Sequence, residues 1–357
     1  MLSHAVRQYG WTFIPNQVLP PLIANTVVGA VLYAGYLQTL AVIHPPSSGA
    51  AKRVYPPPSF SAAYSAGFIS GSFASLIAAP VDALQVRFQA HDMMAGKYRN
   101  MWLYAFSKTR EIGLRGVFAG WSLSFLKDSF GYGIFFGTFE YVKSQCFYRF
   151  VSDYYGHYGK LSSSQKASLD SQQSQSPSND PRTDGSSNPV IKPHYMLEPS
   201  FILLAGIAAS IAQQTIQHPL SRIQEIHYGR LLYIDSHPKS KFSLHPYSRT
   251  RTLKLYASAY RKTWKEVLVL ARREFGERSE PTSRSSPASP SSASSSSSGV
   301  NPAALRRWLY ADFIRSTLRQ APSTSVGLIV FEVVRRKYAT DADVVKIEKD
   351  GYDILLP

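Results

Sequence analysis

The chain has 357 residues, of which only 17% are charged, and its 39 lysines and arginines against 23 acidic residues give a net charge of +16. An average soluble domain has about 25% charged residues, so a basic, charge-poor chain with 13% aromatic residues is more typical of a membrane protein than of a soluble enzyme. The single cysteine, Cys146, excludes a disulfide framework and a zinc site built on several thiolates.

The first long apolar segment lies in a stretch without charges. No Asp, Glu, Lys or Arg occurs between Gln8 and Ala51. Within that stretch, residues 20–43 are apolar enough to form a helix that crosses a bilayer, which needs about 20 residues. The stretch is too long to be the core of a secretory signal peptide, and residues 1–10 before it are polar.

Four further apolar segments follow along the chain. Two of them are free of charges: residues 54–81 and 199–221. The other two, residues 121–142 and 313–334, contain charges: Lys127 and Asp128 in the first, Arg315 and Arg319 in the second. A single such segment could be a core helix of a large soluble protein, but five in a basic chain predict an all-α membrane protein with five recognisable transmembrane helices. An ionisable group inside a membrane is costly, so these charges are predicted to face a water-filled cavity.

Two polar segments separate the apolar ones. Residues 161–190 and 278–302 are rich in Ser, Pro and Gln and nearly free of large apolar side chains. Such segments cannot bury enough apolar surface to offset the entropy of ordering, so both are predicted to be disordered.

The apolar segments contain an internal repeat. Gly67 is followed by Pro80 after thirteen positions, and Gly206 is followed by Pro219 after the same interval. Both intervals begin with small residues four apart, as in Gly67 and Gly71, a pattern that lets helices approach closely.

The two charged apolar segments, residues 121–142 and 313–334, also match each other. Phe139-Glu140-Tyr-Val-Lys143 matches Phe331-Glu332-Val-Val-Arg335, an aromatic residue and an acid followed by a base. Thirteen residues before each Glu lies a cation with a polar neighbour: Lys127-Asp128 and Arg319-Gln320. The same count back from Leu37 in the first apolar segment gives Ala24-Asn25, a weaker copy. Self-similarity at fixed offsets indicates tandem repeats of one structural unit.

These motifs resemble the mitochondrial carrier family. Its repeat has an odd helix ending in P-x-[DE]-x-x-[KR]-x-[RQ], a short matrix helix with a Gly-rich signature, and an even helix ending in [FY]-[DE]-x-x-[RK]. The Gly-rich signature is present at residues 111–120. The resemblance covers residues 10–155 and 196–340 and points to a degenerate, fungal-type member that lacks the first transmembrane helix.

The resemblance implies a carrier-like bundle of tandem helix-pair repeats. The expected segments are a partial first repeat (1–45, even helix 20–43), a second repeat (46–155, helices about 58–90 and 120–146), a disordered linker (156–195), a third repeat (196–340, disordered insertion 277–302) and a C-terminal tail (341–357). The interval from Pro80 to Glu140 would place the proline of the first odd helix about 23 positions before Met1. Either the chain is incomplete, which we favour because a missing helix would open the cavity to lipid, or it is a relative that lost this helix.

The resemblance also assigns candidate site residues. The substrate-contact positions are Asn25, Lys127, Asp128, Arg319 and Gln320. The gate positions are Asp82, Gln85, Gln224, Glu140, Lys143, Glu332 and Arg335, and the prolines that kink the odd helices are Pro80 and Pro219. Asp82 is expected to face Gln224 rather than a base, so hydrogen bonds of about 1 kcal/mol each would replace the ion pairs at this gate.

The expected function is transport. Lys127 and Arg319 supply two cations for a small anionic or zwitterionic metabolite, such as a carboxylate or an amino acid. Asp128 could receive an amine, or could form a locally satisfied pair with Lys127. Transport would proceed by alternating access around this central site, with the prolines as the bending points.

The remaining expectations concern location and partners. The resemblance implies a multi-pass protein of the mitochondrial inner membrane, with the outer membrane as the alternative. It also implies a monomer that is not an enzyme and has no cofactor or metal, its partners being a small metabolite and membrane lipids such as cardiolipin. The basic stretch Arg249–Arg273 is predicted to contact anionic lipid headgroups rather than nucleic acid, and His218 to be a hydrogen-bond partner rather than a metal ligand. A carrier-like membrane adaptor that does not transport is the alternative function.

Overall fold

The computed structural model describes residues 19–48, 56–87, 101–156, 190–191, 197–236, 249–275, 302–338, 345–349 and 352–356. Most of the two segments predicted to be disordered lies outside these residues. The prediction was wrong for residues 190–191, which form a strand, and for Gly156 and Pro302, which end one helix and begin another.

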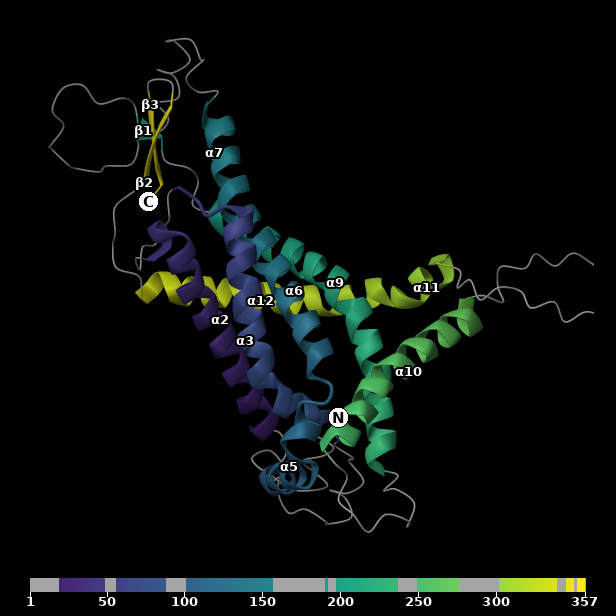
Figure 1. Ribbon diagram of the computed structural model, residues 1–357. Coiled ribbons are helices and arrows are strands. Elements are labelled where there is room, and N and C mark those ends of the chain that lie inside the picture. Colours follow the sequence, from purple (N-terminus) through teal and green to yellow (C-terminus); the bar gives the residue numbers. More distant parts are fainter. Residues whose placement is uncertain are drawn as a thin grey trace, which may run out of the picture. The chain divides into compact units, whose positions relative to one another are not determined.

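The described part of the chain is mainly helical (Figure 1), which confirms the predicted class of an all-α membrane bundle. The α-helices are α2 (Leu19–Ile43), α3 (Phe60–Arg87), α5 (Met101–Val117), α6 (Trp121–Glu140), α7 (Phe147–Gly156), α9 (Leu197–Ser236), α10 (Arg249–Phe275), α11 (Pro302–Leu309) and α12 (Phe313–Tyr338). A short 3-10 helix, η2 (Pro45–Ser48), follows α2, and a π-helix, η3 (Tyr141–Cys146), joins α6 to α7.

Three helices of the described part are long and apolar enough to cross a membrane. They cover residues Leu19–Ile43, Phe60–Leu84 and Leu197–Tyr233. Helices α6 and α12, which were also predicted to span, are outside this set, and both carry charged residues along their length. Pro80 and Pro219 lie inside α3 and α9, and Pro322, which the sequence analysis passed over, lies inside α12.

A small sheet accompanies the helices. Strands β2 (Val345–Lys349) and β3 (Tyr352–Leu356) pair in an antiparallel hairpin, and β1 (Val190–Ile191) pairs in parallel with β3. The C-terminal tail therefore folds back on the segment between the second and third repeats. The residues between β2 and β3 in the sequence are Asp350-Gly351, a strong hairpin signal that the sequence analysis missed.

The chain forms two compact units, which cut across the long helices. The first unit comprises Met1–Ala34, Ser70–Gly131 and Gln214–Ser316, and the second comprises Gly35–Ile69, Tyr132–Gln213 and Thr317–Pro357.

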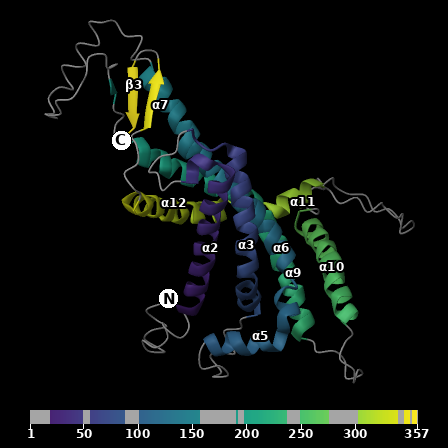
Figure 2. The same ribbon diagram turned by 60° about the vertical axis from the view of Figure 1, so that its left-hand side comes forward.

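In the first unit, α10 runs beside the second half of α9 (Figures 1 and 2) and packs on α11. Val267 and Ala271 of α10 and Trp308 of α11 are buried together, with half-buried residues of α9 against them. Arg222 of α9 lies over the Trp308 ring, 4.9 Å from its centre. Asp312, at φ 61°, occupies the left-handed region in the turn between α11 and α12, where Asp is better tolerated than most residues.

This cluster predicts a measurable loss of stability when Trp308 is truncated. Trp308→Ala is expected to lower the free energy of unfolding by about 3–5 kcal/mol, because a buried indole is lost and a cavity remains. Thermal unfolding of the detergent-solubilised protein measures this loss. Arg307→Ala, which truncates the exposed neighbour on the same helix, is the control, and equal midpoints for the two variants would contradict the packing described.

In the second unit, α3 and α6 touch backbone to backbone. A Cβ atom added to Gly67 would lie 2.6 Å from the carbonyl oxygen of Tyr132 and 3.1 Å from the Cα of Gly133. The predicted close approach of helices at Gly67 is therefore confirmed. Aromatic side chains pack around it, with the rings of Tyr36 and Phe136 stacked 3.8 Å apart.

Candidate functional site

A polar cluster in the first unit brings together three helices. Asp82 comes from the end of α3, two residues after Pro80, and Ser124 lies in the first turn of α6. Gln224 and Tyr228 lie on α9, four residues apart and hence on one face of the helix. We call these four residues the polar cluster.

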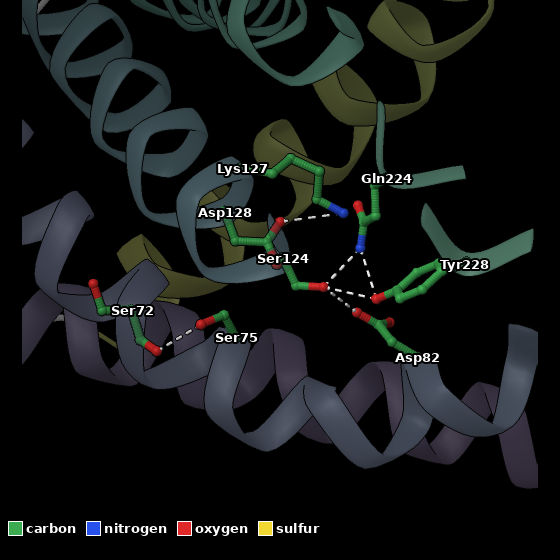
Figure 3. Close-up of polar contacts among 8 residues, drawn as sticks. All are labelled: Ser72, Ser75, Asp82, Ser124, Lys127, Asp128, Gln224 and Tyr228. Carbon is green, nitrogen blue, oxygen red and sulfur yellow. Dashed lines mark hydrogen bonds and ion pairs between the residues drawn. The ribbon is translucent and has the colours of Figure 1, made fainter. Parts of the chain in front are cut away.

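The polar cluster is a continuous hydrogen-bond network (Figure 3). Ser124 Oγ lies 3.3 Å from Asp82 Oδ2 and 2.9 Å from the Tyr228 hydroxyl. Gln224 Nε2 donates to Ser124 Oγ at 2.7 Å and to the Tyr228 hydroxyl at 2.8 Å. Ser124 and Gln224 are buried, so leaving these groups unpaired would be costly.

The number of protons fixes the direction of these hydrogen bonds. Ser124 has one hydroxyl proton, which it donates to the Asp82 carboxylate. The Tyr228 hydroxyl must then donate to Ser124 while it accepts from Gln224. Donation therefore runs from Gln224 through Tyr228 and Ser124 to Asp82, an arrangement that stabilises negative charge on this carboxylate.

An ion pair lies next to the polar cluster on α6. Lys127 Nζ is 3.6 Å from Asp128 Oδ1, and the two side chains are 20% and 14% exposed. The Lys127 ammonium also attracts the Asp82 carboxylate, and the two carboxylates repel each other. When ionised, these three groups carry one positive and two negative charges.

The other predicted substrate contacts come from other helices. Asn25 is exposed on α2 in the first unit, whereas Arg319 and Gln320 are exposed on α12 in the second unit. Only Lys127 and Asp128, of the five predicted contacts, are brought together within one unit by a described interaction.

The predicted gate residues divide into three groups. Asp82 and Gln224 share the polar cluster, joined through Ser124 rather than facing each other directly. Glu140 and Lys143 pair with each other at 3.7 Å where α6 passes into the π-helix, and Ser144 donates to Glu140 at 2.8 Å. The side chains of Gln85, Glu332 and Arg335 lie outside the described residues.

Sequence reasoning missed Ser124 and Tyr228. Each lies one helical turn from a residue that the motifs did identify, since Ser124 precedes Lys127 by three positions and Tyr228 follows Gln224 by four. Residues at these spacings are neighbours on a helix surface, so a search of adjacent polar positions would have found both.

Metal binding has no support within the described residues. They contain no group of three His, Cys, Asp or Glu side chains that could hold a metal ion. His218 Nε2 lies 2.9 Å from the carbonyl oxygen of Ala311 and donates to it, which confirms the predicted hydrogen-bonding role of this residue.

Comparison with known proteins agrees with the repeat. Residues 56–149 match the family model described as "mitochondrial carrier protein". The chain is 30% identical over 89 residues to the mitochondrial arginine transporter BAC2 of Arabidopsis thaliana, covering 25% of this chain and 29% of that protein. It is 33% identical over 128 residues to human solute carrier family 25 member 45, covering 34% of this chain and 43% of that protein.

These matches span less than half the length of both curated relatives. No solved structure matches the chain at a significant level. The matched residues contain α3, α6 and the Lys127–Asp128 pair, the part of the chain in which the repeat motifs are most complete. Residues 56–149 are therefore similar to a repeat of the mitochondrial carrier family.

Proposed function

We propose that the protein carries a small zwitterionic metabolite, an amino acid, across the mitochondrial inner membrane by alternating access. The observation that carries the proposal is the Lys127–Asp128 pair, adjacent opposite charges held largely buried on α6 within a carrier repeat. An ammonium and a carboxylate side by side complement the carboxylate and the amine of an amino acid. In this role the protein is a transporter and not an enzyme.

The local charge balance favours a substrate with a cationic group. Asp82 and Asp128 together outweigh Lys127 by one negative charge when all three are ionised. A dicarboxylate would add two further negative charges beside them, whereas an amino acid with a basic side chain would offset the excess. One of the matched relatives is named as an arginine transporter, which supports the same substrate class.

Asn25, Arg319 and Gln320 complete the proposed site, at positions equivalent by count to Lys127 and Asp128 in the other repeats. Arg319 would hold the substrate carboxylate with a second cation, and the two amides would donate and accept neutral hydrogen bonds. In the proposed mechanism this site lies near the middle of the membrane, as in other carriers with repeats around a central axis, and access alternates between the two faces.

Uptake into proteoliposomes tests the proposal. The reconstituted full-length protein is expected to take up radiolabelled arginine or lysine saturably, and unlabelled basic amino acids should compete better than malate or ATP. Asp128→Asn should lower the uptake of basic amino acids about tenfold or more, because the partner of the substrate ammonium is lost. Failure to transport any of these compounds would contradict the proposal and favour the adaptor function.

A further inference from the structure

Tyr228 of the polar cluster lies on α9, and its hydroxyl bonds one residue of α6 and one of α9. It lies 2.9 Å from Ser124 Oγ on α6 and 2.8 Å from Gln224 Nε2 on α9, and Ser124 in turn reaches Asp82 on α3. We infer that Tyr228 is a latch that closes the end of the first unit containing α5 and α10. This inference rests on the proposed transport function, in which that end must open and close.

The latch is neutral where the family resemblance leads one to expect charge. Gln224 stands where a carrier gate has a base, and the groups that contact Asp82 and Tyr228 among the described side chains are Ser124 and Gln224, both uncharged. The bonds that link α9 to α6, from Tyr228 and Gln224 to Ser124, join neutral groups, and such bonds act at short range and are hardly affected by salt, unlike ion pairs. The strength of the link between α9 and α6 should therefore depend less on ionic strength than that of an ion pair.

The Tyr228 ring packs closely against the turn that precedes α6. It lies against the backbone of Gly120, in the turn between α5 and α6, and a Cβ at position 120 would collide with the ring carbons Cε1 and Cδ1. Glycine permits this close approach because it has no side chain. This packing positions the hydroxyl of Tyr228 within hydrogen-bond distance of Ser124, which lies four residues after Gly120.

Helix α10 contacts both the turn before α6 and the residue before Tyr228. The Tyr260 hydroxyl donates to the carbonyl oxygen of Ala119 at 3.0 Å and accepts from Ser122 at 2.6 Å. Its ring stacks on His227, the residue before Tyr228, with the ring centres 4.1 Å apart. Burial raises the pKa of Tyr260 above its ordinary value, so its hydroxyl stays neutral and keeps its proton for Ala119. Helix α10 thus fixes both the turn that carries Gly120 and the turn that carries Tyr228.

Thiol labelling tests the latch without any substrate. Lys127 lies one turn beyond Ser124 along α6, so a cysteine there should become accessible from the α5–α10 end only when the latch opens. In the full-length Cys146→Ser, Lys127→Cys protein, Tyr228→Phe is expected to raise the rate of labelling by a membrane-impermeant maleimide about tenfold, because one hydroxyl serves two hydrogen bonds. The control is Tyr233→Phe, which removes the hydroxyl of an exposed tyrosine on the same helix.

An added charge distinguishes a latch from a general loosening of the fold. Gln224→Lys places an ammonium near Asp82 and is expected to slow labelling below the rate of the parent protein, in a manner that added salt reverses. Combined with Tyr228→Phe, it should return the rate toward that of the parent. Equal rates for Tyr228→Phe and Tyr233→Phe, or no restoration by Gln224→Lys, would overturn the latch while leaving the uptake result untouched.

Discussion

Replacing Arg319 with alanine is expected to reduce the uptake of basic amino acids about a hundredfold. Arg319 lies on α12 with its side chain exposed, at the position that corresponds by count to Lys127. Hydrogen bonds to a charged group contribute about 1.5–3 kcal/mol each, and tenfold in binding corresponds to about 1.4 kcal/mol. Loss of a guanidinium that holds the substrate carboxylate is therefore sufficient for this effect, and initial rates of uptake into proteoliposomes measure it.

Two further variants on α12 make this test specific. Arg315→Ala removes an exposed cation one turn earlier on the same helix and should leave uptake close to that of the parent protein. Arg319→Lys keeps the charge but loses the planar fork that binds a carboxylate with two parallel bonds, so an intermediate rate is expected. Unaltered uptake by Arg319→Ala would remove this residue from the substrate site and leave Lys127 as the one cation proposed there.

Replacing Gly67 with valine is expected to prevent the protein from folding. The added Cβ would lie 2.6 Å from the Tyr132 carbonyl oxygen and 3.1 Å from the Gly133 Cα. Both are backbone atoms of α6, so the clash cannot be relieved by rotating a side chain, and α3 and α6 would have to move apart. The yield of monodisperse protein after membrane extraction, together with its thermal unfolding midpoint, measures the outcome.

A second glycine in an apolar helix provides the matched control. A Cβ on Gly29 in α2 would meet no atom within 4 Å, so Gly29→Val makes the same chemical change without the clash and should give a normal yield and midpoint. Similar behaviour of the Gly67 and Gly29 variants would show that the close contact of α3 with α6 is absent in the membrane.

The sequence predicted those parts of the fold that depend on the residues of a single segment. The charge-free segments predicted α2, α3 and α9 as apolar helices of membrane-spanning length, because hydropathy over about 20 residues is a property of the segment itself. The intervals between glycines, prolines and charged residues indicated the carrier repeat, and residues 56–149 match that family. They also predicted the close approach at Gly67.

Two features of the fold were not predicted. One had a short sequence signal that was overlooked, and the other has no signal in the sequence. The Asp350-Gly351 dipeptide could have predicted the β2–β3 hairpin. By contrast, no sequence signal marks residues 141–146 as a π-helix. This π-helix sets the positions of Glu140, Lys143 and Ser144 relative to one another, and π-turns of this kind are frequent at functional sites.

The sequence alone thus determined the helical membrane class of the protein, its resemblance to a carrier repeat, and the presence of Lys127 and Asp128 at adjacent positions in an apolar segment. The tertiary structure alone decided which residue joins Asp82 to Gln224. Their shared partner Ser124 is 42 residues from Asp82 and 100 from Gln224, and Tyr228 is 104 residues from Ser124. Hydrogen bonds act only over about 3 Å. The packing of α3, α6 and α9 therefore decides which of the many serines and tyrosines on different helices come into contact, and no motif within one helix contains that information.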